Sequence, residues 1–132
     1  MKVLRSLAPL ITILVLFTSL QAHALEAESF TKERFDALQA EGAPILVDVY
    51  ATWCPTCKKQ REVLSAYQTQ NPDTELVILE VDYDDQKEWV KHFKAPRQST
   101  LVLFDGSEQV WFSVAETREE KIFGALDELL EP

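Results

Sequence analysis

The sequence predicts an α/β domain whose central mixed β-sheet has helices on both faces. Short apolar runs typical of buried strands alternate with amphipathic segments of helical spacing, the pattern of parallel strands joined by helices. The last two runs are separated by Asp105-Gly106, a hairpin turn signal that makes one pair of strands antiparallel. Residues 25–132 have the length of one domain with a single core.

The predicted elements follow the order α-β-α-β-α-β-β-α. They are helix 30–39, strand 45–50, helix 55–70, strand 75–82, a short helix that ends at 93, strands 100–104 and 109–114, and a C-terminal helix that starts near 117. Residues 94–99 form a loop before the hairpin. The apolar residues of the last helix repeat at helical spacing, which gives it one face that packs on the sheet.

Residues at the helix ends support these boundaries. Phe30 and Phe35 are spaced for a hydrophobic staple across the start of the first helix, and Gly42 is suited to end that helix. Capping side chains are expected at the N-termini of three helices: Thr31, then Asp84 or Asp85, and finally Thr117 with Glu120 as a capping box.

A buried strand leads two cysteines to the start of a helix in residues 45–61. The strand is apolar apart from Asp48, and the residues after Cys57 are mostly good helix formers. Pro55 is tolerated only in a first helical turn, so Cys54 lies at or beside the helix N-cap. Because a helix N-terminus stabilises an anion, we expect a lowered pKa for Cys54. Cys57, one turn further on, is placed to resolve a mixed disulfide.

The first 24 residues have the pattern of a secretory signal peptide. Lys2 and Arg5 form a basic segment, residues 7–20 are mostly apolar, and the tripeptide Ala-His-Ala that follows matches a cleavage site. The alternative is an uncleaved membrane anchor, but the apolar run is shorter than the roughly 20 residues of a membrane-spanning helix. We therefore predict a signal peptide over 1–24, with export of residues 25–132 to a bacterial periplasm.

Composition restricts the partners of the predicted domain. Two of the 13 basic side chains and none of the 22 acidic ones lie in residues 1–24, so residues 25–132 carry a formal charge of −11. Such acidity argues against nucleic acid as a partner. Both cysteines lie in a single C-x-x-C, which leaves none for a structural disulfide and favours redox chemistry in an exported domain. We expect a monomer that uses no cofactor.

The runs VDVYATWCPTC and TLVLFDGSEQV resemble the thioredoxin superfamily. The first is similar to its active site, and the second to the strand, turn and strand that follow its active-site proline loop. W-C-x-x-C after a strand and at the start of a helix is a specific signal, whereas C-x-x-C alone is a weak one. The resemblance covers nearly all of residues 25–132 and is strongest to exported bacterial members. It implies the thioredoxin fold, with Cys54 as the attacking cysteine and Cys57 as the resolving one.

The resemblance also implies a role for Asp48, which matches a buried aspartate of thioredoxins. Burial raises a carboxyl pKa, so this group is suited to exchange protons with Cys57 during turnover. The alternative is an outward-facing aspartate at a strand end. Ile78 stands where thioredoxins often have a lysine that accompanies this aspartate. A solvated helix face is expected for the basic residues after the cysteines: Lys58, Lys59 and Arg61.

The chain departs from the family pattern at Ser99, where thioredoxins have a cis-proline that faces the two sulfurs. A non-proline residue needs about 2.5–4 kcal/mol to hold a cis bond, so the Gln98-Ser99 peptide is either trans or held cis by its surroundings. The serine hydroxyl is available to bond a thiolate. Ala115 stands near a glycine of the thioredoxin binding rim. The residues expected to contact substrate are Trp53, Pro55, Thr56, Ser99 and Thr100.

These observations predict a periplasmic thiol:disulfide oxidoreductase. Reduced Cys54 attacks a disulfide of an exported protein, and Cys57 resolves the mixed disulfide. We expect a reductase supplied by a membrane electron donor, because Asp48 and Trp53 are thioredoxin-like and no helical domain for gripping unfolded chains is inserted. Pro55-Thr56, which tunes the potential, matches neither the Gly-Pro of thioredoxins nor the Pro-His of strong periplasmic oxidants.

The alternative function is the binding or delivery of a soft metal ion. Two thiolates suffice to hold Cu(I), and a serine at position 99 leaves the two sulfurs less obstructed than a proline ring does. Against this function, the chain has no Met-rich or His-rich tract. We therefore assign no metal ligand. A redox-inactive interaction domain is the third interpretation, and the intact dithiol argues against it.

Overall fold

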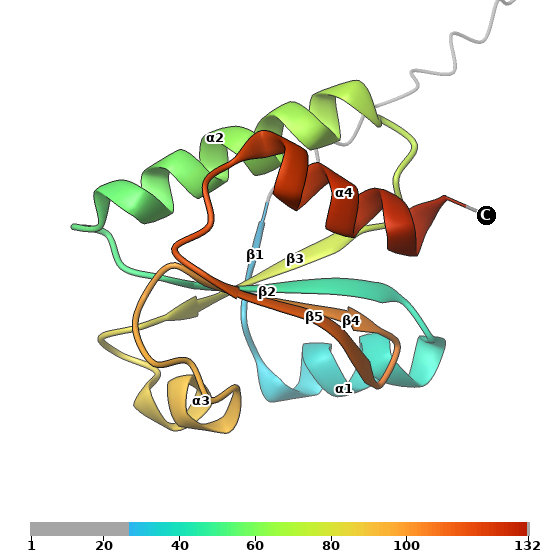
Figure 1. Cartoon of the computed structure of the whole chain (residues 1–132). Coiled ribbons are helices and arrows are strands. Elements are labelled where there is room, and N and C mark those ends of the chain that lie inside the picture. The colour runs from blue at the N-terminus through green and yellow to red at the C-terminus, as the bar shows by residue number, and fades with distance from the viewer. Residues whose placement is uncertain (1–26, 132) are drawn as a thin grey trace, which may run out of the picture.

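The computed structural model describes residues 27–131, which form a five-stranded sheet between two pairs of helices (Figure 1). The elements are β1 (Glu28–Ser29), α1 (Lys32–Glu41), β2 (Pro44–Tyr50), α2 (Pro55–Gln70), β3 (Val77–Asp82), α3 (Lys87–His92), β4 (Thr100–Asp105), β5 (Glu108–Val114) and α4 (Glu119–Leu130). The predicted signal peptide, residues 1–24, lies outside the described residues. Within residues 27–131 no helix has the length and apolar character needed to cross a membrane.

The sheet places β2, the strand that leads to the cysteines, at its centre. The strand order is β1-β3-β2-β4-β5. β3 runs parallel to both β1 and β2, whereas β4 runs antiparallel to both β2 and β5. This mixed sheet with helices on both faces confirms the predicted architecture. Because β2 is paired along both edges, its C-terminal end is held firmly where the cysteine segment begins.

Alternating side chains along the central strands build one core on each face of the sheet. Val47 and Val49 belong to the core covered by α1 and α3, while Leu46 belongs to the core covered by α2 and α4. Figure 1 shows these two helix pairs on opposite sides of the sheet. Asp48 shares the face of Leu46, so its carboxyl lies on the side that carries the cysteine helix α2.

The first helix begins and ends as the sequence predicts. Thr31 is the N-cap of α1, and its hydroxyl accepts a hydrogen bond from the Arg34 amide at 3.2 Å. The rings of Phe30 and Phe35 lie 5.6 Å apart, which confirms the hydrophobic staple. Gly42 ends the helix with a φ of 70°, a left-handed conformation that glycine adopts without steric cost.

The predicted cap of α3 is wrong. The helix begins after Gln86, which makes no side-chain capping bond. Asp84 and Asp85 lie in the preceding turn, where their amides donate to Oδ1 of Asp82 at 2.8 and 2.9 Å. Asp82, at the end of β3, therefore accepts both amides within a turn. The helix starts only after this turn, with Gln86 as its N-cap.

The predicted capping box of α4 is also wrong. The N-cap is Arg118 rather than Thr117, and it makes no side-chain capping bond. Oε1 of Glu116 instead accepts the amides of Thr117 and Arg118 at 3.0 and 2.9 Å. A carboxylate one residue upstream of the expected cap thus binds the free amides, and Glu120 does not reach back.

Two features of the sheet were not predicted. β1 is only two residues long and exposed, so it carries no apolar pattern, yet it extends the sheet by pairing with β3. The hairpin turn is shifted by one residue, because β4 continues through Asp105 and the turn is Gly106-Ser107. Gly106 has a φ of 54°, and a Cβ atom there would lie 3.2 Å from the backbone of Gly42.

Candidate active site

The two cysteines lie where β2 ends and α2 begins. Cys54 is the N-cap of α2, with an extended backbone, and Pro55 occupies the first helical turn. The Cys57 amide donates to Cys54 Sγ at 3.1 Å, and the two cysteines form a disulfide with their Cα atoms 5.3 Å apart. The predicted position of Cys54 at the helix N-terminus is therefore confirmed, and its sulfur itself acts as the capping group.

Both sulfur-bearing residues are buried. Cys54 is 4% exposed and Cys57 is 1% exposed, so Cys54 is marginally the more accessible of the two. Ala51 packs beside both cysteines, and Tyr50 and Tyr83 pack against this small cluster. The surroundings are mostly apolar, which limits the access of water to the dithiol.

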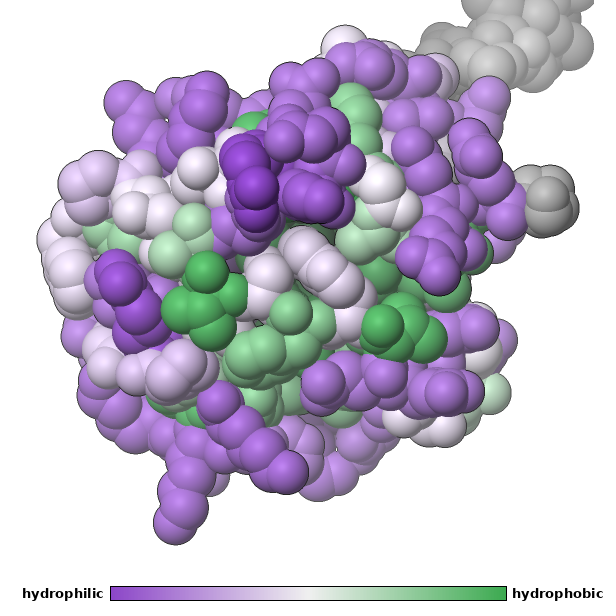
Figure 2. Space-filling model, in the orientation of Figure 1, coloured by the Kyte–Doolittle hydropathy of each residue, from purple (hydrophilic) through white to green (hydrophobic). Residues whose placement is uncertain are grey.

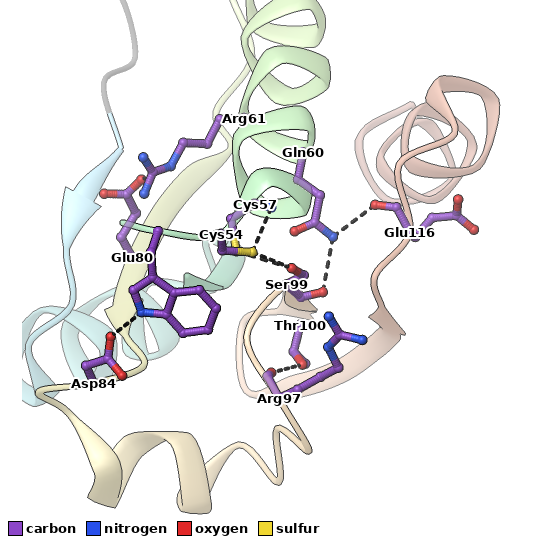
Figure 3. The surroundings of a disulfide bond; sticks show 11 residues. Cys54, Cys57, Gln60, Arg61, Glu80, Asp84, Arg97, Ser99, Thr100 and Glu116 are labelled. Carbon is purple, nitrogen blue, oxygen red and sulfur yellow. Dashed lines mark hydrogen bonds and ion pairs between the residues drawn. A yellow bond between two sulfur atoms is a disulfide. The ribbon is translucent and has the colours of Figure 1, made fainter. Parts of the chain in front are cut away.

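Ser99 faces the disulfide from the loop before β4 (Figure 3). Its Oγ atom lies 3.0 Å from Cys54 Sγ and 3.2 Å from Cys57 Sγ, and the residue is fully buried. No peptide bond in the described chain is cis, so the Gln98-Ser99 peptide is trans. Ser99 has a φ of 63°, which places a non-glycine residue in the left-handed region.

Three hydrogen bonds hold the backbone of Ser99 in this conformation. Its amide donates to the Val49 carbonyl at 2.8 Å, and its carbonyl accepts from the Ala115 amide at 2.8 Å and from Gln60 Nε2 at 3.1 Å. Gln60 also donates to the Glu116 carbonyl at 2.9 Å. The site therefore joins the end of β2, the helix α2 and the segment after β5.

Sequence reasoning missed Gln60. It lies one turn after Cys57 on the inner face of α2 and is fully buried, in line with Leu64 and Tyr67. A polar residue within an apolar stripe of helical spacing was the signal that could have identified it. Within the described chain its Oε1 atom has no hydrogen-bond partner.

Asp48 is buried, 1% exposed, and neither carboxylate oxygen has a partner within residues 27–131. Burial and the negative charge of Glu80 raise the pKa of Asp48 to about 7, against a smaller lowering by Arg61. Glu80 is its register partner on the parallel strand β3. The alternative of an outward-facing aspartate is excluded, and the carboxyl has the burial that the resemblance implied.

Arg61 is half-buried and paired, and so only partly fits the predicted solvated helix face. Its Nε atom pairs with Glu80 Oε1 at 3.1 Å, and its guanidinium lies 4.3 Å from the centre of the Tyr50 ring. Lys58 and Lys59 are exposed, as predicted. The charges nearest to the buried Asp48 thus come from an arginine-glutamate pair, and no lysine is among them.

The residues expected to contact substrate differ in accessibility. Trp53 is 58% exposed, and its Nε1 atom donates to Asp84 Oδ2 at 2.8 Å. Pro55 is exposed and Thr56 is half-buried, so all three lie at the surface beside Cys54. Thr100 is fully buried, and its hydroxyl donates to a backbone carbonyl of the preceding loop. Its side chain therefore does not reach the surface.

For the alternative function of metal binding, the described residues supply no group of additional ligands beside the cysteines. Within residues 27–131 no group of three or more His, Cys, Asp or Glu side chains is placed to hold a metal ion. The groups that make hydrogen-bond contacts with the two sulfurs are the Ser99 hydroxyl and the Cys57 amide, and each can donate a hydrogen to sulfur. The arrangement is suited to stabilising a negative sulfur.

A C-x-x-C disulfide at the start of a helix, at the end of the central strand of this mixed sheet, defines a protein of the thioredoxin-fold class. The sequence model of the thioredoxin family matches residues 26–128, so the chain belongs to the thioredoxin family. The matched range includes every strand and nearly all of α4.

Relatives and solved structures agree with this assignment. A thioredoxin of Mycobacterium tuberculosis is 36% identical over 67 residues, which are 51% of this chain and 57% of that protein. The thiol:disulfide interchange protein DsbE of Escherichia coli is 33% identical over 70 residues, 50% of this chain and 35% of DsbE. The matched segments thus span about half or less of these relatives. The crystal structure of Trxlp from Edwardsiella tarda, 36% identical, covers 80% of this chain and all of that one, with a TM-score of 0.71.

Proposed function

We propose that this protein is a periplasmic thiol:disulfide oxidoreductase that reduces disulfides in exported proteins. The observation that carries the proposal is the position of Cys54, whose sulfur caps α2, accepts the Cys57 amide and is joined to Cys57 in a disulfide. A helix N-terminus stabilises the thiolate, which is the attacking form of cysteine. The relatives described as thioredoxin and as a thiol:disulfide interchange protein support the same activity.

Turnover uses both sulfurs in order. The Cys54 thiolate attacks one sulfur of the substrate disulfide, and the other substrate sulfur leaves as a thiolate and takes up a proton. Cys57 then loses its proton and attacks Cys54 Sγ, so that the second substrate sulfur leaves and the Cys54-Cys57 disulfide forms. Two electrons have passed to the substrate. A donor must return them, and for an exported protein we place that donor in the membrane.

We assign to Asp48 the exchange of a proton with Cys57. A carboxyl whose pKa is about 7 holds or accepts a proton near neutral pH, which an ordinary aspartate does not. The absence of a partner for either oxygen, within the described residues, leaves this carboxyl free to take the proton. Asp48 in this role acts when Cys57 becomes the nucleophile.

Substrate contacts are assigned to both sides of the disulfide. Trp53, Pro55 and Thr56 form the exposed side, next to the more accessible Cys54. On the other side Ser99 and Thr100 have buried side chains, so we assign their contact with substrate to the backbone at the start of β4. The protein acts as a monomer in this proposal.

Export follows from residues 1–24, which we propose to be a signal peptide that precedes the thioredoxin domain of residues 25–132. The supporting pattern is a basic start, an apolar run and a small-x-small end. The single C-x-x-C pair favours redox chemistry over a disulfide scaffold in an exported domain. Detection of the protein in the periplasmic fraction, with Leu25 as its first residue, tests this part of the proposal.

The reduction potential of the Cys54-Cys57 couple tests the direction of the reaction. Metal-free protein is equilibrated with glutathione and with dithiothreitol. A value near that of thioredoxin, about −270 mV, is expected for a reductase. A value near about −120 mV, that of a strong periplasmic oxidant, would show instead that the protein donates disulfides.

Two single-cysteine variants test the roles of the sulfurs. With Cys57→Ala, the attack by Cys54 occurs but resolution does not, so a mixed disulfide with substrate accumulates and is detected by mass spectrometry. Cys54→Ala is the matched control and traps no substrate. Equal trapping by both variants would contradict the assignment of Cys54 as the attacking cysteine.

A further inference from the structure

The hydroxyl of Ser99 lies between the two sulfurs of the active site, and Figure 3 shows it pointing at the disulfide. Its distances to Cys54 Sγ and Cys57 Sγ are 3.0 and 3.2 Å. Within residues 27–131 these sulfurs are its hydrogen-bond partners. Because the sulfurs of a disulfide carry no hydrogen, the hydroxyl is the donor, and its single hydrogen is shared between the two contacts.

The position of this hydroxyl is fixed before any substrate arrives. The carbonyl of Val49, the amide of Ala115 and the side chain of Gln60 bind the Ser99 backbone from three directions. A φ of 63° is unfavourable for a non-glycine residue, and such conformations persist where the surroundings enforce them. A donor held in this way needs no rearrangement when charge develops on a sulfur.

The two sulfurs are not equivalent once the disulfide is reduced. Cys54 Sγ also accepts the Cys57 amide at 3.1 Å and lies at the N-terminus of α2, whereas the hydroxyl of Ser99 is the donor that Cys57 Sγ contacts. A thiolate is a stronger acceptor than a disulfide sulfur, and hydrogen bonds to the charged form favour it. Negative charge is therefore most stable on Cys54, where two donors converge.

We propose that Ser99 is a catalytic residue whose hydroxyl donates a hydrogen bond to the Cys54 thiolate and so favours the reduced form of the dithiol. Ser99 keeps its proton throughout, and no bond to its oxygen forms or breaks. Gln60 is a positioning residue that holds the Ser99 carbonyl. The proposal rests on the proposed function in one respect, the use of Cys54 as the attacking sulfur.

The acidity of the Cys54 thiol provides the test. In a Cys57→Ala background a single thiol titrates, and the amide of residue 57 remains. Removing a hydrogen bond to a charged group is expected to reduce the thiolate equilibrium about tenfold, which raises the thiol pKa by about one unit. Ser99→Ala and Ser99→Gly are both expected to show this rise. Ser107→Ala, which removes an exposed hydroxyl in the hairpin turn, is the matched control and leaves the thiol pKa unchanged.

The potential of the intact dithiol gives a second readout. Loss of the donor destabilises the reduced form, so Ser99→Ala lowers the reduction potential by about 30 mV for a tenfold effect. An unchanged thiol pKa in both variants would overturn the proposal. Glycine adopts a φ of 63° without strain, so loss of the fold in Ser99→Gly would show that the hydroxyl is a structural group and would also overturn it.

The titration uses no substrate, which separates this inference from the proposed function. A protein that reduces no disulfide but shows the rise in thiol pKa retains the Ser99 donor and lacks the proposed activity. A protein that reduces disulfides and shows no rise has the activity without this donor.

Discussion

At the residue scale, the buried carboxyl of Asp48 makes the stability of the protein depend on pH. Its pKa is about 7 in the folded protein, whereas an unfolded aspartate has a value near about 3.9. The folded state therefore binds this proton more tightly, and stability falls as the pH rises from about 4 to 7. The loss is complete above pH 7. At 1.36 kcal/mol per unit, a shift of about 3 units corresponds to about 4 kcal/mol.

Asp48→Asn removes this titration. We expect the free energy of unfolding at pH 8 to rise by up to about 4 kcal/mol, with a smaller change at pH 4, because the amide has no charged form to bury. Urea unfolding at a series of pH values measures the effect. Asp85→Asn, at an exposed position, is the control and keeps the slope of the parent protein. The same slope in Asp48→Asn would contradict the assignment of the pH dependence to this carboxyl.

The sequence predicted the reacting residues better than the groups that support them. Cys54 and Cys57 were found because a proline and a run of helix formers locate the helix start within one residue. Ser99 was marked by its departure from the family pattern, but its distances to the sulfurs depend on a left-handed backbone that no local residue pattern specifies. Gln60 was missed because its partners are carbonyls 39 and 56 residues away along the chain.

At the element scale, the start of α4 depends on one carboxylate rather than on the predicted capping box. Glu116 accepts the amides of Thr117 and Arg118, and it also binds the guanidinium of Arg118. The Arg118 side chain, followed by the backbone amides, lowers the pKa of Glu116 to about 2. The Glu116 carboxylate therefore stabilises the folded protein fully above the unfolded pKa of about 4.3, and this stabilisation is lost as the pH falls through about 2.

Glu116→Ala is expected to lower the free energy of unfolding by about 1 kcal/mol, the usual cost of losing a helix cap. Urea unfolding at neutral pH measures this change. Thr117→Ala, the matched variant at the originally predicted cap, is expected to alter stability by less than about 0.5 kcal/mol because its hydroxyl caps no amide. A larger loss in Thr117→Ala than in Glu116→Ala would reverse the assignment.

Helix and strand identities were predictable from periodicity, whereas the junctions were not. Strong apolar patterns located the interior strands and the two helices α2 and α4, which cover the same face of the sheet. At α3 and α4 an acidic residue upstream of the expected cap accepts hydrogen bonds from the free amides. The sequence pattern of the helix itself does not indicate this residue, because it lies outside the helix. β1 lies outside any such search because two exposed residues pair through their backbone alone.

At the scale of the whole molecule, an acidic chain exposes an apolar strip along the edge strand β5. Residues 25–132, the proposed mature protein, carry a formal charge of −11. Figure 2 shows a mostly hydrophilic face with a hydrophobic band over the edge of the sheet, where Val110, Phe112 and Val114 of β5 are exposed. A disulfide substrate of the proposed reaction is therefore subject to long-range electrostatics from the chain as a whole.

The net charge predicts how salt alters the reaction with small disulfides. Cystamine is a cation and glutathione disulfide an anion, so the reduced protein attracts the first and repels the second. Raising the ionic strength from about 0.01 to 1 M shortens the screening length from about 30 to 3 Å. The rate with cystamine is expected to fall and the rate with glutathione disulfide to rise, by up to about tenfold. Stopped-flow measurement of tryptophan fluorescence, with Trp53 beside the dithiol, follows both reactions. Parallel salt responses of the two disulfides would mean that local charges near Cys54, and not the net charge, control the approach.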